Sequence, residues 1–179
     1  MAYNESGAIS TERELERMEK LRILIAEDDL LLQEIYDYSL SGHVFDKKIV
    51  GNGADALDTY KTWKPDLIML DSIMPVMTGY SALKEIRTTL HDKTTPVVIS
   101  TSMSKSEDVL SFAKLGISGY IVKPFDPDEI GAKILSYYEK THPQAAQEAT
   151  EMQLGTIEQW HGEWEKMKEH PEEAESATE

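Results

Sequence analysis

The sequence predicts an α/β domain with an open parallel sheet between about residues 21 and 140. Short apolar segments recur along this region, as in buried strands. Longer segments between them carry apolar side chains every three or four positions, as in helices that bury one face. Alternating strands and helices are joined by right-handed crossovers, so the strands run parallel and helices cover both faces of the sheet.

Five segments have the apolar or β-branched character of strands: Leu21–Ala26, Lys48–Val50, Leu67–Leu70, Pro96–Ser100 and Gly119–Val122. Leu67–Leu70 gives the clearest pattern, because it is an uninterrupted apolar run between Asp66 and Asp71. Lys48–Val50 gives the weakest.

Each predicted strand is followed by an amphipathic helix, and two of these helices have clear start signals. Ser104 and Glu107 have the spacing of a capping box before the fourth helix. Asp126 is predicted to cap the fifth helix, with Pro127 at its first position. The fifth helix should bury one apolar stripe, which consists of Ile130, Ile134, Leu135 and Tyr138.

Composition limits the function. The chain has 179 residues, a net charge of −15 and no cysteine, which excludes disulfides and thiolate chemistry and disfavours nucleic-acid binding. Residues 1–20 form an N-terminal extension without a basic and apolar targeting pattern, so we expect a cytoplasmic protein without membrane insertion. Residues 141–179 carry ten acids and two bases and are predicted to be an acidic tail.

Carboxylates follow two predicted strands: Glu27 and Asp28 after the first, and Asp71 after the third. In an open α/β sheet the ligand site lies beyond the carboxyl ends of the strands, where the strand order reverses. Three carboxylates meeting there would repel one another, and a hard divalent cation such as Mg²⁺ would offset their charge. The alternative for residues 27–29 is an acidic helix N-terminus that complements the helix dipole.

Two further polar side chains follow strands. Thr101 offers a hydroxyl donor and Lys123 offers a positive charge, and together they suit the oxygens of a phosphoryl group. Each has a simpler explanation. A threonine at a strand end often makes a local turn bond, and a lysine there often extends into water.

The segment around Asp71 resembles the receiver domain of two-component response regulators, whose pattern is Leu-Asp-x-x-Met-Pro-x-Met-x-Gly. The matching residues are Leu70, Asp71, Met74, Pro75, Met77 and Gly79. The resemblance covers residues 21–140 and implies one domain with a flavodoxin-like, doubly wound, five-stranded sheet in the order 2-1-3-4-5.

The resemblance also implies the roles of the site residues. Asp71 would be the phosphoacceptor, and Mg²⁺ would be bound by Asp28, Asp71 and the backbone carbonyl of Ile73, with Glu27 acting through water. Thr101 and Lys123 would contact the phosphoryl group, and the Lys123–Pro124 bond would be cis. Thr101 and Tyr120 would be the switch residues.

Ile73 and Met103 would border the path of the hydrolytic water in such a domain. Neither side chain offers a strong hydrogen-bond acceptor, so we expect water there to be poorly held and the aspartyl phosphate to be long-lived.

The resulting prediction is a single-domain response regulator that is not an enzyme. A sensor histidine kinase or a histidine phosphotransfer protein would phosphorylate Asp71, and the fourth helix, fifth strand and fifth helix would contact a downstream protein. One alternative is a phosphorelay intermediate. Another is a Mg²⁺-dependent phosphatase resembling haloacid dehalogenases, but Ile73 stands where those enzymes carry an acid/base aspartate.

The tail contains a possible amphipathic helix at residues 150–168. Its apolar side chains step by three or four positions and are Leu154, Ile157, Trp160, Trp164 and Met167. The tail has no helix-turn-helix pattern, so we expect no nucleic-acid partner.

Overall fold

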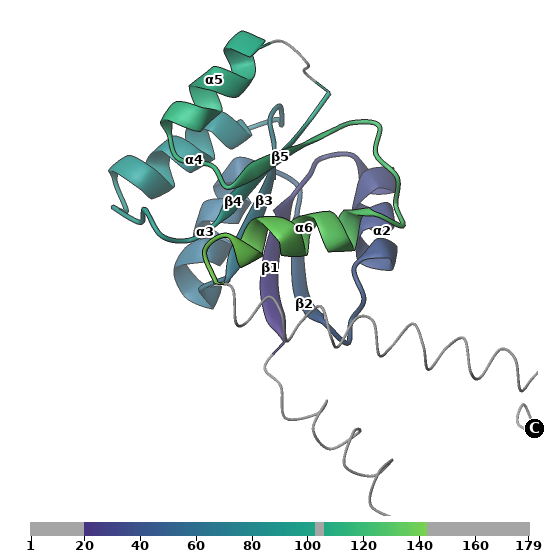
Figure 1. The fold of residues 1–179 in the computed structure, drawn as a ribbon. Helices are drawn as coiled ribbons and strands as arrows, with labels where there is room; N and C mark the ends of the chain where they lie inside the picture. The colour runs from purple at the N-terminus through teal and green to yellow at the C-terminus, as the bar shows by residue number, and fades with distance from the viewer. Residues whose placement is uncertain (1–19, 103–105, 143–179) are drawn as a thin grey trace, which may run out of the picture.

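The computed structural model describes residues 20–102 and 106–142, in which five strands alternate with five helices (Figure 1). The strands are β1 (Leu21–Ala26), β2 (Phe45–Val50), β3 (Leu67–Asp71), β4 (Val97–Thr101) and β5 (Gly119–Val122). The helices are α2 (Leu30–Ser39), α3 (Gly53–Trp63), α4 (Gly79–Thr88), α5 (Ser106–Lys114) and α6 (Ile130–Glu139).

All strand pairs are parallel, and the sheet order is β2-β1-β3-β4-β5, which confirms the predicted flavodoxin-like topology. The chain moves from β1 outward to β2 and then crosses back to β3, so the direction of winding reverses between β1 and β3. The carboxyl ends of these two neighbouring strands therefore border the crevice in which ligands of such sheets bind.

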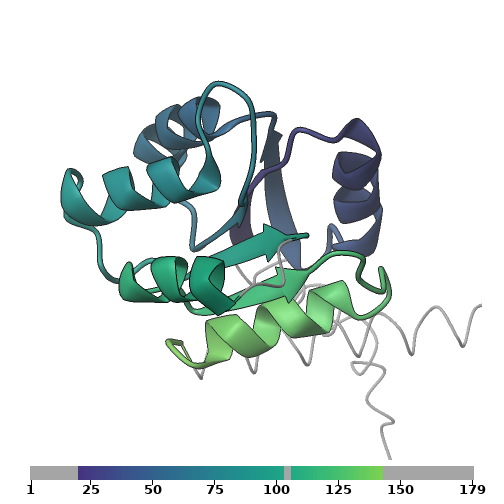
Figure 2. The same ribbon diagram turned by 90° about the horizontal axis from the view of Figure 1, so that it is seen from above.

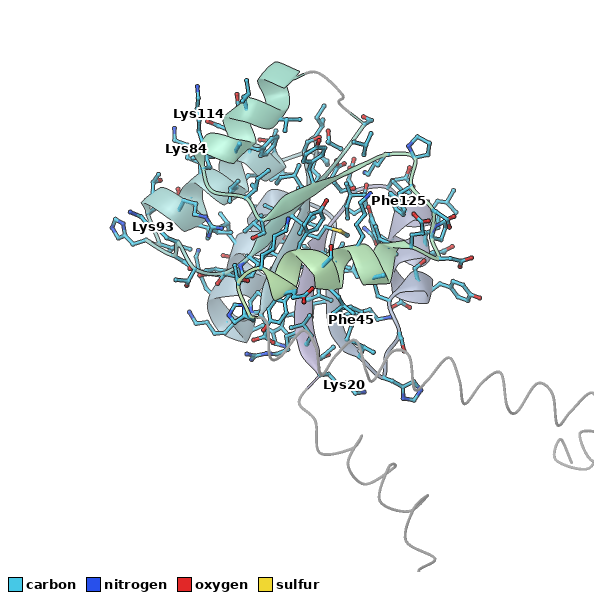
Figure 3. All side chains as sticks on the ribbon, viewed as in Figure 1. Lys20, Phe45, Lys84, Lys93, Lys114 and Phe125 are labelled. Atoms are coloured by element: carbon cyan, nitrogen blue, oxygen red, sulfur yellow. The ribbon has the colours of Figure 1, made fainter. Side chains whose placement is uncertain are left out.

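Helices cover both faces of the sheet. Helices α2 and α6 lie on one face and α3, α4 and α5 on the other, as Figures 1 and 2 show from two directions. Phe45 and Phe125, labelled in Figure 3, pack on the α2–α6 side. The central strand β3 is buried along its whole length, which agrees with its continuous apolar sequence. The predicted stripe of α6 is buried as expected.

Strand β3 ends one residue later than predicted, at Asp71, and β4 lies one residue later, at Val97–Thr101, while β2 and α6 differ more. Strand β2 begins at Phe45 rather than Lys48, because it is an edge strand that pairs only with β1 and so tolerates charged side chains such as Lys47. Helix α6 begins at Ile130, and the Asp126 carboxylate instead accepts a bond of 3.0 Å from the backbone N–H of Asp128 in the preceding turn. The proposed cap residue Ser104 lies outside the described residues.

Two other predictions also concern residues outside this range: the N-terminal extension and the amphipathic segment 150–168. Within residues 20–102 and 106–142, no helix combines the length and apolar content needed to cross a membrane.

Candidate functional site

The carboxyl ends of β1 and β3 bring three acidic side chains together. Glu27, Asp28 and Asp71 each place a carboxylate oxygen within 4.8 Å of the others. Strand register explains the meeting, because Ala26 at the end of β1 pairs with Leu70 just before Asp71. Glu27 and Asp71 are buried, whereas Asp28 is exposed to solvent.

Asp29 has a different role from its two acidic neighbours. Its carboxylate accepts bonds from the backbone N–H groups of Leu31 and Leu32, at 2.8 and 3.3 Å, and so caps α2. The helix-terminus explanation therefore holds for Asp29, while Glu27 and Asp28 face the cluster.

The loop after Asp71 folds back close to that residue. Val76 has a positive φ of 65°, and the Met77 N–H donates to the Pro75 carbonyl at 2.6 Å, which closes a tight turn. At Gly79 a Cβ atom would lie 2.0 Å from the backbone oxygen of Asp71. Only glycine permits α4 to begin this near Asp71.

Lys123 reaches into the acidic cluster. Its Nζ lies 2.6 Å from Glu27 Oε2 and 3.3 Å from Asp71 Oδ2, and its side chain is 14% exposed. The explanation of a lysine extending into water is therefore wrong. The Lys123–Pro124 peptide bond is cis, as the resemblance implied.

Glu27 is almost fully buried, and both of its oxygens have protein donors. Oε2 accepts from Lys123, and Oε1 accepts a bond of 3.3 Å from the Asp29 N–H. Burial raises the pKa of Glu27, against the lowering effect of Lys123, and the nearby Asp71 charge also raises it. The predicted role of Glu27 through a metal-bound water stays a prediction.

Thr101 lies at the end of β4 with a partner that the sequence did not reveal. Ser72 Oγ donates to Thr101 Oγ1 at 2.9 Å, and both residues are buried. One position earlier, Ser100 Oγ shares a hydrogen bond of 2.8 Å with Tyr36 Oη from α2. A signal was available, because serines directly beside buried strand residues need partners.

The remaining predicted residues surround this centre. Tyr120 on β5 is 44% exposed, and its carbonyl accepts a bond of 2.8 Å from Tyr137 Oη on α6. Ile73 is exposed in the loop after Asp71. Met103 lies outside the described residues, so the expected shielding of the aspartyl phosphate stays a prediction.

The donor set fits a hard divalent cation. The cluster offers only oxygen ligands, and two of its three carboxylates are buried where like charges repel most strongly. This acidic cluster could therefore hold a metal ion. The predicted Mg²⁺ ligands, Asp28, Asp71 and the backbone carbonyl of Ile73, stay a prediction.

The comparisons with known proteins agree with this geometry. Residues 23–135 match the family model described as the response regulator receiver domain. The chain is 34% identical over 113 residues to the DNA-binding response regulator MtrA of Mycolicibacterium paratuberculosis, covering 63% of this chain and 49% of that protein. It is 34% identical over 119 residues to the probable transcriptional regulator ycf27 of Porphyridium aerugineum, covering 66% and 48%. The chain thus spans about half the length of these curated relatives.

Solved structures show the same fold. The receiver domain of the Francisella response regulator 1452 aligns with a TM-score of 0.62 and 28% identity, over 68% of this chain and 99% of that one. The receiver domain of a putative Luxo repressor protein from Vibrio parahaemolyticus aligns with a TM-score of 0.64 and 25% identity, over 70% and 95%. The sheet order, the cis Lys123–Pro124 bond and the acidic cluster agree with the family model. The chain belongs to the response regulator receiver domain family.

Proposed function

We propose that this chain accepts a phosphoryl group on Asp71 from a sensor histidine kinase or a histidine phosphotransfer protein, and that it acts as a signalling protein rather than an enzyme. The observation that carries this proposal is the contact of Lys123 with Asp71, beside two further carboxylates. An aspartate in this environment has a positive charge 3.3 Å away to meet an incoming phosphoryl group.

The transfer would proceed by attack of an Asp71 oxygen on phosphorus. A P–O bond forms, the P–N bond to the donor histidine breaks, and the ring nitrogen keeps the electron pair and takes a proton. Mg²⁺, when bound by Asp28, Asp71 and the Ile73 carbonyl, would supply positive charge at the phosphoryl oxygens. Phosphoryl transfer depends chiefly on positioning and on such charge neutralisation.

The output would be contact with another protein through the face of α5, β5 and α6. Leu110, Tyr120 and Val122 leave large apolar side chains exposed on α5 and β5, which supports a protein contact there. MtrA is described as DNA-binding. We propose a protein partner for the residues described here, in the cytoplasm, with no nucleic-acid or membrane contact.

A phosphorelay intermediate remains the second candidate, since the same acceptor would serve it. The phosphatase alternative is disfavoured by Ile73, whose side chain cannot transfer a proton.

Intact-mass measurement tests the proposal. Incubation of the full chain with acetyl phosphate and Mg²⁺ should add one phosphoryl group. Asp71→Asn or EDTA should prevent the addition, and Lys123→Ala should slow it without abolishing Mg²⁺ binding. Undiminished labelling of Asp71→Asn would exclude Asp71 as the acceptor. Rapid transfer of the label to a histidine phosphotransfer protein would favour the phosphorelay candidate.

A further inference from the structure

A serine hydroxyl lies directly beside the proposed phosphoacceptor. Ser72 directly follows Asp71, and its Oγ donates to Thr101 Oγ1 at 2.9 Å. The contact is sheltered from water, because Ser72 is 6% and Thr101 4% exposed. Water therefore does not compete for this hydrogen bond.

The backbone fixes this pair of hydroxyl groups. Asp71 pairs with Ser100 across the β3–β4 ladder, and the Ser72 N–H donates to the Ser100 carbonyl at 3.0 Å, which extends the ladder by one residue. Thr101 is the next residue on β4, so the two side chains meet at the same level of the sheet. Threonine is stiff about χ1, which further restricts the position of Oγ1.

We propose that Ser72 is a positioning residue that orients the Thr101 hydroxyl for hydrogen bonding to a phosphoryl group on Asp71. This inference rests on the proposed function of Asp71. Ser72 itself would not contact the phosphoryl group.

The reason lies in the donor and acceptor capacity of a hydroxyl, which has one hydrogen and two lone pairs. Because Thr101 Oγ1 accepts the hydrogen of Ser72, its own hydrogen must point away from Ser72. A hydroxyl that already accepts a hydrogen bond is also polarised into a stronger donor. Ser72 therefore restricts the direction of the Thr101 hydrogen and strengthens the bond that it donates.

The effect should appear in the rate of phosphoryl addition. With acetyl phosphate, an Asp71 oxygen bonds to phosphorus, the acyl O–P bond breaks and acetate leaves with the electron pair. Ser72 and Thr101 contribute hydrogen bonds only and transfer no proton. Loss of the Ser72 hydroxyl should slow the addition by about three- to tenfold, the range that one hydrogen bond commonly accounts for.

The matched variants are Ser72→Thr and Ser72→Val, which have the same shape and differ in the hydroxyl. Intact-mass time courses on the full chain, at saturating Mg²⁺, should give a near wild-type rate for Ser72→Thr and a slow rate for Ser72→Val. Ser72→Ala, which cannot overpack the site, should be slow as well. Tyr36→Phe is the control, because it removes a buried hydrogen bond to β4 that does not involve Thr101, and its rate should be unchanged.

A double-mutant cycle separates positioning from general support of the fold. In a Thr101→Val background, Ser72→Val should cause no further slowing, because its effect acts through the Thr101 hydroxyl. Equal rates for Ser72→Val and Ser72→Thr would overturn the inference, as would full additivity in the cycle or equal slowing by Tyr36→Phe. A wild-type chain that takes no phosphoryl group at all would instead overturn the proposed function, and the inference with it.

Discussion

Both ends of the sheet contain buried charged side chains, but the two ends differ in how these side chains are paired and hydrogen-bonded. At the carboxyl end, Lys123 contacts two of the three carboxylates of the cluster, those of Glu27 and Asp71. At the amino end, Arg87 is 7% exposed and its guanidinium donates to four backbone carbonyls. The difference separates a site arranged to receive a ligand from one arranged to hold loops in place.

The amino-end network joins α3, α4 and the loops that lead into β4 and β5. Arg87 donates to four backbone carbonyls at 2.8 to 3.2 Å, those of Asp92, Thr95, Leu115 and Gly116. Tyr60 Oη donates to Asp92 Oδ2 at 2.6 Å. Burial lowers the pKa of Arg87, while the Asp92 charge opposes that effect. Each polar group named here has a hydrogen-bond partner, so the network should stabilise the fold.

The largest expected effect is the loss of Arg87. Arg87→Leu replaces the guanidinium with an apolar side chain and leaves four backbone carbonyls without their donor. We therefore expect the free energy of unfolding to fall by about 3–5 kcal/mol. Urea unfolding of the full chain measures it. Lys84→Leu is the control on the same helix, since Lys84 is exposed (Figure 3), and it should change stability by less than about 0.5 kcal/mol. A cost below about 1 kcal/mol for Arg87→Leu would show that water replaces the guanidinium.

Removing the buried charge of Glu27 at the carboxyl end should instead raise the free energy of unfolding. Burial raises the pKa of Glu27 above 4.5, so its contribution to stability is present below pH 4.5 and is lost as the pH rises through the folded-state value. At neutral pH the ionised carboxylate therefore costs stability. We expect Glu27→Gln to be more stable than wild type in EDTA.

Added Mg²⁺ sharpens this test, because an ion bound by the native cluster stabilises the wild type and should narrow the gap to Glu27→Gln. Glu34→Gln, an exposed change on the neighbouring helix α2, should have no comparable effect. A Glu27→Gln protein less stable than wild type would mean that the bond to Lys123 outweighs the cost of burying the carboxylate.

The carboxyl end was far easier to predict from the sequence than the amino end. Asp71 and Lys123 each follow an apolar strand, and parallel strands bring such residues to one edge. Arg87 has no such signal, because its partners are backbone carbonyls that any residue supplies. The Ser72–Thr101 bond depends on strand register at the level of single residues, which periodicity does not determine. The predicted start of α6 was wrong for a related reason, because Asp126 suits a turn as well as a helix cap.

The smallest effect we expect concerns Tyr60. Burial raises the pKa of Asp92, but hydrogen bonds from Thr95 and Tyr60 outweigh it and hold the pKa well below 3.8. Asp92 therefore contributes stability above pH 3.8, and this contribution is lost as the pH falls through the folded-state value. Tyr60→Phe removes one of these bonds and should cost about 1 kcal/mol at neutral pH.

Urea unfolding of wild type, Tyr60→Phe, Asp92→Asn and the double variant at neutral pH tests the origin of that cost. If the cost comes from the bond to the Asp92 carboxylate, Tyr60→Phe should cost less in the Asp92→Asn background, which has no carboxylate. The gap between wild type and Tyr60→Phe should shrink only at a pH low enough to protonate Asp92 in the folded protein, well below pH 3.8. An equal cost in both backgrounds would assign it to packing of the ring rather than to the carboxylate. The polar contribution at the amino end would then come from Arg87 and its carbonyl partners.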